Sequence, residues 1–104
     1  MNVDPSWCAA LLTAARNFPG AILVGMIRTT WNAKGMVRRG DGFWREFERR
    51  ADGDALTFRA CCSGNLAVPA QVFRSLGGFR ADLRRIEDLE FGFRAERAGV
   101  PLRF

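Results

Sequence analysis

The most informative stretch of this chain consists of residues 77–79 (GGF) and residues 87–94 (EDLEFGFR), with the spacer 80–86 between them. Two glycines and an aromatic residue end one segment, and a pair of adjacent carboxylates opens the next. Glycine takes a positive φ without a steric penalty, and acidic side chains are favoured where a helix begins. The stretch therefore predicts a helix that ends at Gly77, a turn, and a second helix that begins at Glu87.

The residues before the two glycines have the pattern of a short helix. Pro69 suits the first position of a helix, where its missing N–H costs nothing. Residues 70–76 carry apolar side chains at helical spacing: Val72, Phe73 and Leu76. After the glycines, Phe79 is expected to anchor in the core, and residues 80–85 are expected to form an exposed turn with Leu83 beneath it.

The second helix is predicted over residues 87–98, because Gly99 and Pro101 together are a typical stop signal. Glu90 and Arg94 are four residues apart, which places them on one face as an ion pair. The predicted buried stripe consists of Ile86, Leu89, Phe93 and Ala98. Spacing alone favours a structural role for Glu87 and Asp88, as acids that cap a helix.

The order of the motifs carries more information than any one of them. Residues 63–69 (SGNLAVP), Val72-Phe73, the GGF turn, Glu87-Asp88, and Arg94 with Ala98-Gly99 follow one another along the chain. This combination resembles the C-terminal half of GT-A fold glycosyltransferases, in particular glycosyltransferase family 2 and the related galactosyltransferase C-terminal domain. The resemblance implies an α/β fold: a partial GT-A (Rossmann-like) domain with a mixed sheet flanked by helices.

The activity implied by the resemblance is transfer of a sugar from a nucleotide-diphosphate-sugar donor to an acceptor hydroxyl on a glycan, a lipid or another molecule. Asp88 matches the position of the family's general base, which removes the proton of the attacking hydroxyl. A base that assists direct attack implies inversion at the anomeric carbon. Glu87 is expected to orient Asp88 or to hydrogen-bond an acceptor hydroxyl.

The remaining site residues are assigned from the same resemblance. Gly77 and Gly78 would let the backbone approach the sugar closely. Asn65 is a candidate for substrate contact, and Arg94 is expected to be structural, bracing the carboxylates.

The first 27 residues fit the same interpretation. Asp4-Pro5 can start a helix, and apolar residues follow at helical spacing: Trp7, Leu11, Leu12, Ala15 and Phe18. Residues 21–27 form an apolar run of strand length that we expect to be covered on both faces. In family 2 enzymes a similar segment follows the Asp-x-Asp motif. That motif and the nucleotide-binding half are therefore expected before Met1, where they would bind Mg or Mn in the complete enzyme.

This chain is accordingly predicted to be one partial domain, residues 1–104, which binds no metal or other cofactor by itself. It divides into residues 1–27, a variable middle region 28–60, and the acceptor-side and catalytic-base region 61–104. The triplet Asp52-Gly53-Asp54 is predicted to be a turn, between a helix at 43–48 and a strand at 56–62. Residues 28–42 are predicted to be a loop, and the aromatic residues of the middle region are assigned no site: Trp31, Phe43 and Trp44.

Charge and cysteine content argue against several classes of protein. The chain has a net charge of +5, with fifteen arginines, one lysine and no histidine. The arginines are dispersed, or occur as pairs, so we expect no nucleic-acid binding. The cysteines, Cys8, Cys61 and Cys62, are expected to be reduced and packed as small apolar groups, since zinc would lack ligands. The chain has no apolar run of about 18 residues and no signal peptide, so we expect no transmembrane segment and a cytoplasmic location, which includes the membrane surface.

Two other functions stay open. The chain could be a non-catalytic module, truncated or part of a split enzyme, that needs a partner chain to supply the nucleotide-binding half. Exposed sheet edges and apolar faces would favour this alternative. A small basic nucleic-acid-binding protein is the lesser alternative, and its affinity would fall steeply with salt.

Overall fold

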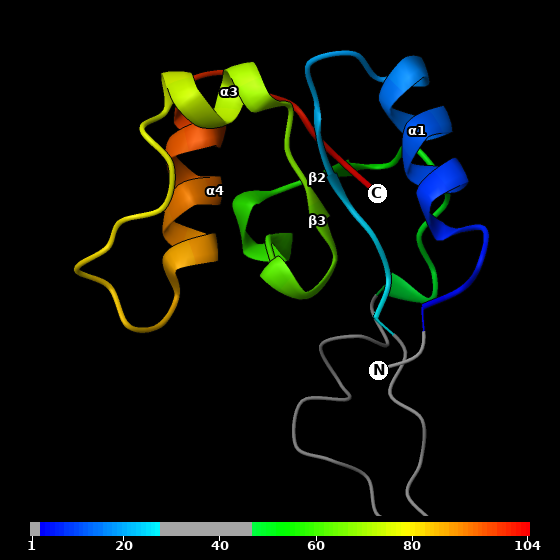
Figure 1. Ribbon diagram of the computed structural model, residues 1–104, viewed down its shortest axis with the longest axis horizontal. Coiled ribbons are helices and arrows are strands. Elements are labelled where there is room, and N and C mark those ends of the chain that lie inside the picture. The colour runs from blue at the N-terminus through cyan, green and yellow to red at the C-terminus, as the bar shows by residue number, and fades with distance from the viewer. Residues whose placement is uncertain (1–2, 28–46) are drawn as a thin grey trace, which may run out of the picture.

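The computed structural model describes residues 3–27 and 47–104, which form a small α/β unit with a mixed four-stranded sheet (Figure 1). In Figure 1, α1 lies on one side of the strands, and α3 and α4 lie on the other. The elements in chain order are α1 (Trp7–Asn17), β1 (Ile22–Val24), β2 (Ala55–Leu56), the 3-10 turns η1 (Phe58–Ala60) and η2 (Ser63–Asn65), β3 (Leu66–Ala67), α3 (Ala70–Ser75), α4 (Glu87–Arg97) and β4 (Leu102–Arg103).

The strand order is β2-β4-β1-β3, so β1 and β4 are the inner strands. β1 runs parallel to β4, with Ile22 opposite Leu102, and antiparallel to β3, with Leu23 opposite Ala67. β2 pairs with β4 in the antiparallel sense. The predicted α/β class with a mixed sheet is confirmed, and the two edges of the sheet are β2 and β3.

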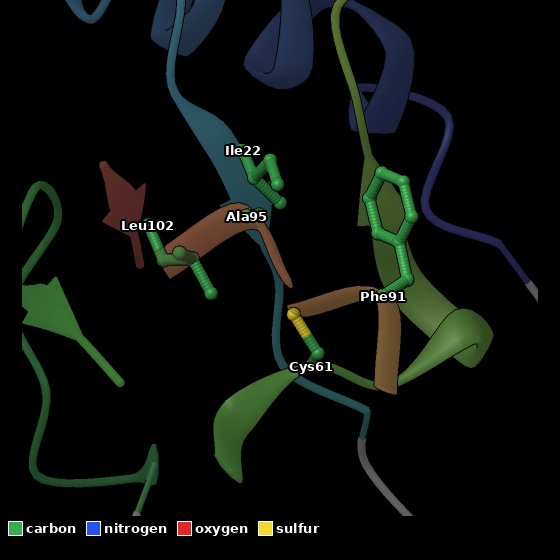
Figure 2. Close-up of a cluster of buried hydrophobic side chains, with 5 residues drawn as sticks. All are labelled: Ile22, Cys61, Phe91, Ala95 and Leu102. Carbon is green, nitrogen blue, oxygen red and sulfur yellow. The ribbon is translucent and has the colours of Figure 1, made fainter. Parts of the chain in front are cut away.

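β1 is the centre of the core. All three of its residues are buried, as the uncharged run at 21–27 predicts, although the strand itself is shorter than that run. Figure 2 shows the main buried cluster, in which side chains from β1, β4, α4 and the segment after η1 meet. Its members are Ile22, Cys61, Phe91, Ala95 and Leu102. Most of this cluster therefore comes from the C-terminal half of the chain.

The predicted starts of the two C-terminal helices are confirmed, and each helix ends one residue earlier than predicted. α3 covers residues 70–75, and Gly77 and Gly78 follow with φ of 79° and 68°. α4 begins at Glu87 and ends at Arg97, and Gly99 has a φ of 77°. The predicted spacer turn is present too, with Leu83 half-buried among exposed neighbours.

The predicted buried stripe of α4 is wrong. The helix buries Phe91, Gly92 and Ala95, whereas Ile86 is 61% exposed and Phe93 is 44% exposed. The reason is the close approach of α4 to the segment after η1. A Cβ built on Gly92 would lie 2.5 Å from Sγ of Cys61, so only the glycine face can pack this closely. The large side chains of the predicted stripe are excluded from that contact.

The predicted strand at 56–62 is also wrong. Only Ala55–Leu56 pairs as a strand, and the chain then coils into η1. A carboxylate of α4 fixes this turn, because Oε2 of Glu96 accepts a 2.7 Å hydrogen bond from the N–H of Phe58. Cys61 is buried and Cys62 is half-buried, and both are free thiols.

α1 is helical as predicted but buries none of its residues. Its start is later than Asp4-Pro5: the Asp4 carboxylate accepts hydrogen bonds of 2.8 and 2.5 Å from the N–H and hydroxyl of Ser6, and the helix begins at Trp7. Trp7 is 39% exposed and Leu12 is 59% exposed. The predicted apolar stripe of α1 therefore faces largely outward in this part of the chain.

The triplet at 52–54 forms the predicted turn, in which Gly53 has a φ of 89° and donates a 2.7 Å hydrogen bond to the carbonyl oxygen of Phe104. The loop at 28–42, residues 43–46 of the helix predicted at 43–48, and the aromatic residues Trp31, Phe43 and Trp44 lie outside the described residues. Among the described residues, no helix is long and apolar enough to cross a membrane.

Candidate functional site

Asp88 is the second residue of α4, and both of its carboxylate oxygens accept backbone hydrogen bonds. Oδ2 accepts from the N–H of Ser63 at 2.8 Å, and Oδ1 accepts from the N–H of Leu89 at 2.8 Å. The carboxylate is half-buried and lies where the helix dipole favours negative charge. Its position is therefore fixed by α4 and by η2 together.

The first turn of α4 holds three acids: Glu87, Asp88 and Glu90. Glu90 forms the predicted pair with Arg94, with Nε–Oε1 and Nη2–Oε2 distances of 2.7 and 2.8 Å. These hydrogen bonds lower the pKa of Glu90. Arg94 thus braces Glu90, and no hydrogen bond or ion pair joins it to Glu87 or Asp88 in the described structure.

Arg94 also ties the glycine turn to α4. Its Nη1 donates to the carbonyl oxygen of Leu76, and its Nη2 donates to that of Gly78 at 2.7 Å. The guanidinium carbon lies 5.5 Å from the ring centre of Phe91. Gly77 and Gly78 are therefore held against the middle of α4.

The side chain of Asn65 forms its hydrogen bonds with residues from the N-terminal part of the chain, not with the other predicted site residues. Its Nδ2 donates to the carbonyl oxygen of Met26 at 3.1 Å, and its Oδ1 accepts from Nε1 of Trp7 at 3.1 Å. A Cβ on Gly25 would lie 2.3 Å from Nδ2 of Asn65, so the glycine makes room for this amide. The Asn65 side chain joins η2 to α1 and to the segment just after β1.

A groove of about 350 Å³ lies beside these elements. Its lining comes from η2, β3, α3 and the residue after the glycine turn: Ser63, Leu66, Val68, Ala70, Phe73 and Phe79. Phe79 is 41% exposed, so the prediction that it anchors in the core is only partly right. Its ring packs edge-on against Phe73 and Phe91 with centroid distances of 5.3 and 5.2 Å. The groove was not predicted from the sequence, because it depends on how the stretch from residue 63 to residue 79 folds back on itself.

The groove connects two groups of predicted site residues. Glu87 and Asp88 lie at the start of α4, whereas Arg94 and the glycine turn lie about 9 Å further along the helix axis. Ser63, which binds Asp88, and Phe79, which follows Gly78, both line the groove. A molecule in the groove can therefore touch residues next to both groups.

The site gives little support to catalysis by the Cys61 thiol or to metal binding by the described residues. Burial, and then the nearby charge of Asp88, raises the pKa of the Cys61 thiol to about 12, so this thiol stays protonated and a poor nucleophile. Over residues 3–27 and 47–104, no three side chains of the types His, Cys, Asp and Glu are grouped as metal ligands. What the arrangement offers is a positioned carboxylate, that of Asp88, bound by the backbone of Ser63, which lines an apolar groove.

Comparisons with protein-family models, with curated proteins and with solved structures found no match to this chain.

Proposed function

We propose that this chain is the acceptor-side part of a GT-A glycosyltransferase domain, in which Asp88 is the general base for sugar transfer to an acceptor hydroxyl. The order of motifs from residue 63 to residue 99 supports this function. The observation that carries the proposal is the fixed carboxylate of Asp88, which Ser63 holds beside the groove.

The chemistry required of a base matches this arrangement. Each carboxylate oxygen has room for two hydrogen bonds, so the backbone contacts leave Asp88 able to accept a proton. A hydroxyl attacking the anomeric carbon of the donor loses its proton as the new bond forms, and a carboxylate within about 3 Å can accept it. The proton then resides on Asp88, and the diphosphate leaves with the electron pair of the broken bond. Attack from the face opposite the leaving group gives inversion.

The other residues have supporting roles in this proposal. Glu87, next to Asp88, would bind an acceptor hydroxyl, and Gly77 and Gly78 would leave space for the backbone to approach the sugar. Arg94 fixes the turn that carries these glycines. The amide of Asn65 already binds Met26 and Trp7, which favours a structural role over substrate contact. In the complete enzyme Mg or Mn would neutralise the diphosphate.

The proposal is tested with Asp88→Asn in the natural gene product, at whatever length the cell makes it. The assay follows release of nucleoside diphosphate from a panel of nucleotide sugars in the presence of hydroxyl acceptors and Mn²⁺. We expect the variant to lose at least about 100-fold in transfer while donor binding stays unchanged, because only proton removal is affected.

Glu96→Gln is the matched control. Glu96 lies on the same helix and, like Asp88, accepts a hydrogen bond from a backbone N–H. Asn and Gln both keep an acceptor oxygen, so the two variants change the fold to a similar extent. Normal transfer by Asp88→Asn, or an equal loss in both variants, would contradict the role of Asp88.

A second candidate function is a module that acts only with a partner chain carrying the nucleotide-binding half. The exposed apolar side chains of α1 favour it, since Leu12 and Trp7 are 59% and 39% exposed. Sedimentation of the natural gene product should then show a complex that Leu12→Glu dissociates, with the helical circular dichroism unchanged. A monomer with full transfer activity would rule this candidate out.

A further inference from the structure

The lining of the groove is unusually apolar for a site that would bind a sugar acceptor. Five of its six residues are apolar, and Ser63 is the polar one. Sites that fix a polar ligand place several hydrogen-bonding side chains around it, whereas an apolar lining gains from contact with apolar groups. The backbone N–H of Ser63 is already bound to Oδ2 of Asp88.

Phe79 gives the second part of the evidence. Its ring stays 41% exposed although Phe73 and Phe91 pack against it. Arg94 holds the carbonyl oxygen of Gly78, so the backbone just before Phe79 is fixed. The contacts with Phe73 and Phe91 orient the ring itself. An apolar ring held in an open groove offers a preformed contact surface for an apolar group.

The groove lining differs in charge from the chain as a whole. The chain carries a net charge of +5, yet the groove lining contains no charged side chain. Arg80, the residue after Phe79, is paired with Asp82. The guanidinium of Arg94 is taken up by Glu90 and by two carbonyl oxygens. A neutral, apolar group therefore suits the groove better than a phosphate or a carboxylate.

From these observations we infer that the groove binds an apolar group that carries the acceptor hydroxyl, so that the acceptor is an amphiphilic alcohol with an aliphatic or aromatic portion. This inference rests on the proposed function. An apolar group in the groove lies beside Ser63, whose N–H binds the carboxylate of Asp88. A hydroxyl at that end of the group would therefore lie next to this carboxylate. The volume of about 350 Å³ is in the range of small-molecule sites.

The experiment measures binding of n-octyl β-D-glucoside and methyl β-D-glucoside to the natural gene product, by NMR titration below the micelle concentration. The two probes share the sugar and differ in the apolar chain. Each buried methylene tightens binding by about threefold to fourfold, so we expect the octyl compound to bind at least about tenfold more tightly. Equal affinity for the two probes would overturn the inference.

Two neighbouring substitutions locate the binding site. Ala70→Glu places a carboxylate in the groove at the first residue of α3, where an acid is compatible with the helix. Gln71→Glu adds the same charge at the next residue, which is exposed and does not line the groove. We expect Ala70→Glu to abolish the octyl preference and Gln71→Glu to keep it. An octyl preference that survives Ala70→Glu would place the octyl group outside the groove and overturn the inference.

The inference and the proposed function fail in different ways. Asp88→Asn should retain octyl glucoside binding while losing transfer. If transfer depends on Asp88 but shows no preference for apolar acceptors, the inference is wrong and the proposed function stands. If octyl glucoside binds in the groove but transfer persists in Asp88→Asn, the role of Asp88 is wrong and the binding site stands.

Discussion

The N–H of Ser63 donates a 2.8 Å hydrogen bond to Oδ2 of Asp88, across 25 residues of sequence. At the other end of α4, Oε2 of Glu96 accepts a 2.7 Å hydrogen bond from the N–H of Phe58. The helix therefore holds the irregular segment from η1 to η2 at two points. Asp88 has a structural contact of its own, which any test of its proposed chemistry has to separate from catalysis.

The first prediction concerns the two hydrogen bonds by which α4 holds the segment from η1 to η2. Asp88→Ala and Glu96→Ala should each lower the free energy of unfolding by about 1 kcal/mol, because each leaves a backbone N–H without its acceptor. Asp88→Asn should cost less, since an amide oxygen can still accept. Urea denaturation followed by circular dichroism measures the loss.

Asp82→Ala is the control for the substitutions of Asp88 and Glu96. The Asp82 carboxylate is exposed and pairs with Arg80 two residues away, so its removal should leave the unfolding midpoint unchanged. A midpoint for Asp88→Ala equal to that of Asp82→Ala would show that the contact with Ser63 does not stabilise the fold.

The second prediction concerns the contact between Gly92 and Cys61. A Cβ at residue 92 would lie 2.5 Å from Sγ and 2.9 Å from Cβ of Cys61. Gly92→Ala should therefore lower the free energy of unfolding by about 1–3 kcal/mol, even though alanine is the better helix former. Cys61→Ala in the same chain removes the sulfur and should recover part of the loss, which a double-mutant cycle measures. Strict additivity of the two substitutions would contradict this packing.

The third prediction concerns Arg94. Lysine cannot bind Glu90 and two carbonyl oxygens at once, because it lacks the planar fork of the guanidinium. Arg94→Lys should lower the melting temperature and speed amide hydrogen exchange at Gly77 and Gly78. Arg97→Lys is the control, since Arg97 is exposed and contacts only the face of Phe93 among the interactions described. Equal exchange in both variants would exclude Arg94 as the tie between the turn and α4.

The fourth prediction concerns pH. The pKa of Cys61 is about 12 in the folded chain against an ordinary value of 9.0. Between these values the unfolded chain loses the thiol proton and the folded chain keeps it, so stability falls as pH rises from about 9 towards 12. The chain contains no tyrosine and one lysine, which leaves few other groups to titrate there. Cys61→Ala should flatten the fall in chemical denaturation measured across this range, and an unchanged slope would contradict the assignment.

Predictions from local signals agree well with the fold. Glycines with positive φ end α3 and α4 at the predicted positions, and the uncharged run at 21–27 contains the central strand. The Glu90–Arg94 pair forms because four residues bring two side chains to the same face of any helix. For the candidate site, the sequence placed Glu87 and Asp88 in the first turn of α4 and the glycines after α3.

The errors occurred where distant segments meet. Ile86 and Phe93 were expected inside because they are large and apolar, yet Gly92 and Ala95 face the core. The segment at 58–60 was expected as a strand, but a carboxylate 38 residues later binds its first N–H and stabilises a turn. Neither contact can be recognised from the spacing of apolar residues, because each joins residues that are far apart in the sequence.

Local sequence signals were enough to predict where the C-terminal helices begin, because φ preferences and helix-terminal charge act within a few residues. The buried face of α4, the backbone N–H that binds Asp88, and the groove lined by Ser63 and Phe79 follow from tertiary packing. These features depend on the distance between segments far apart in the chain. That distance is set by how closely side chains such as Cys61 can pack against Gly92, which no local pattern encodes.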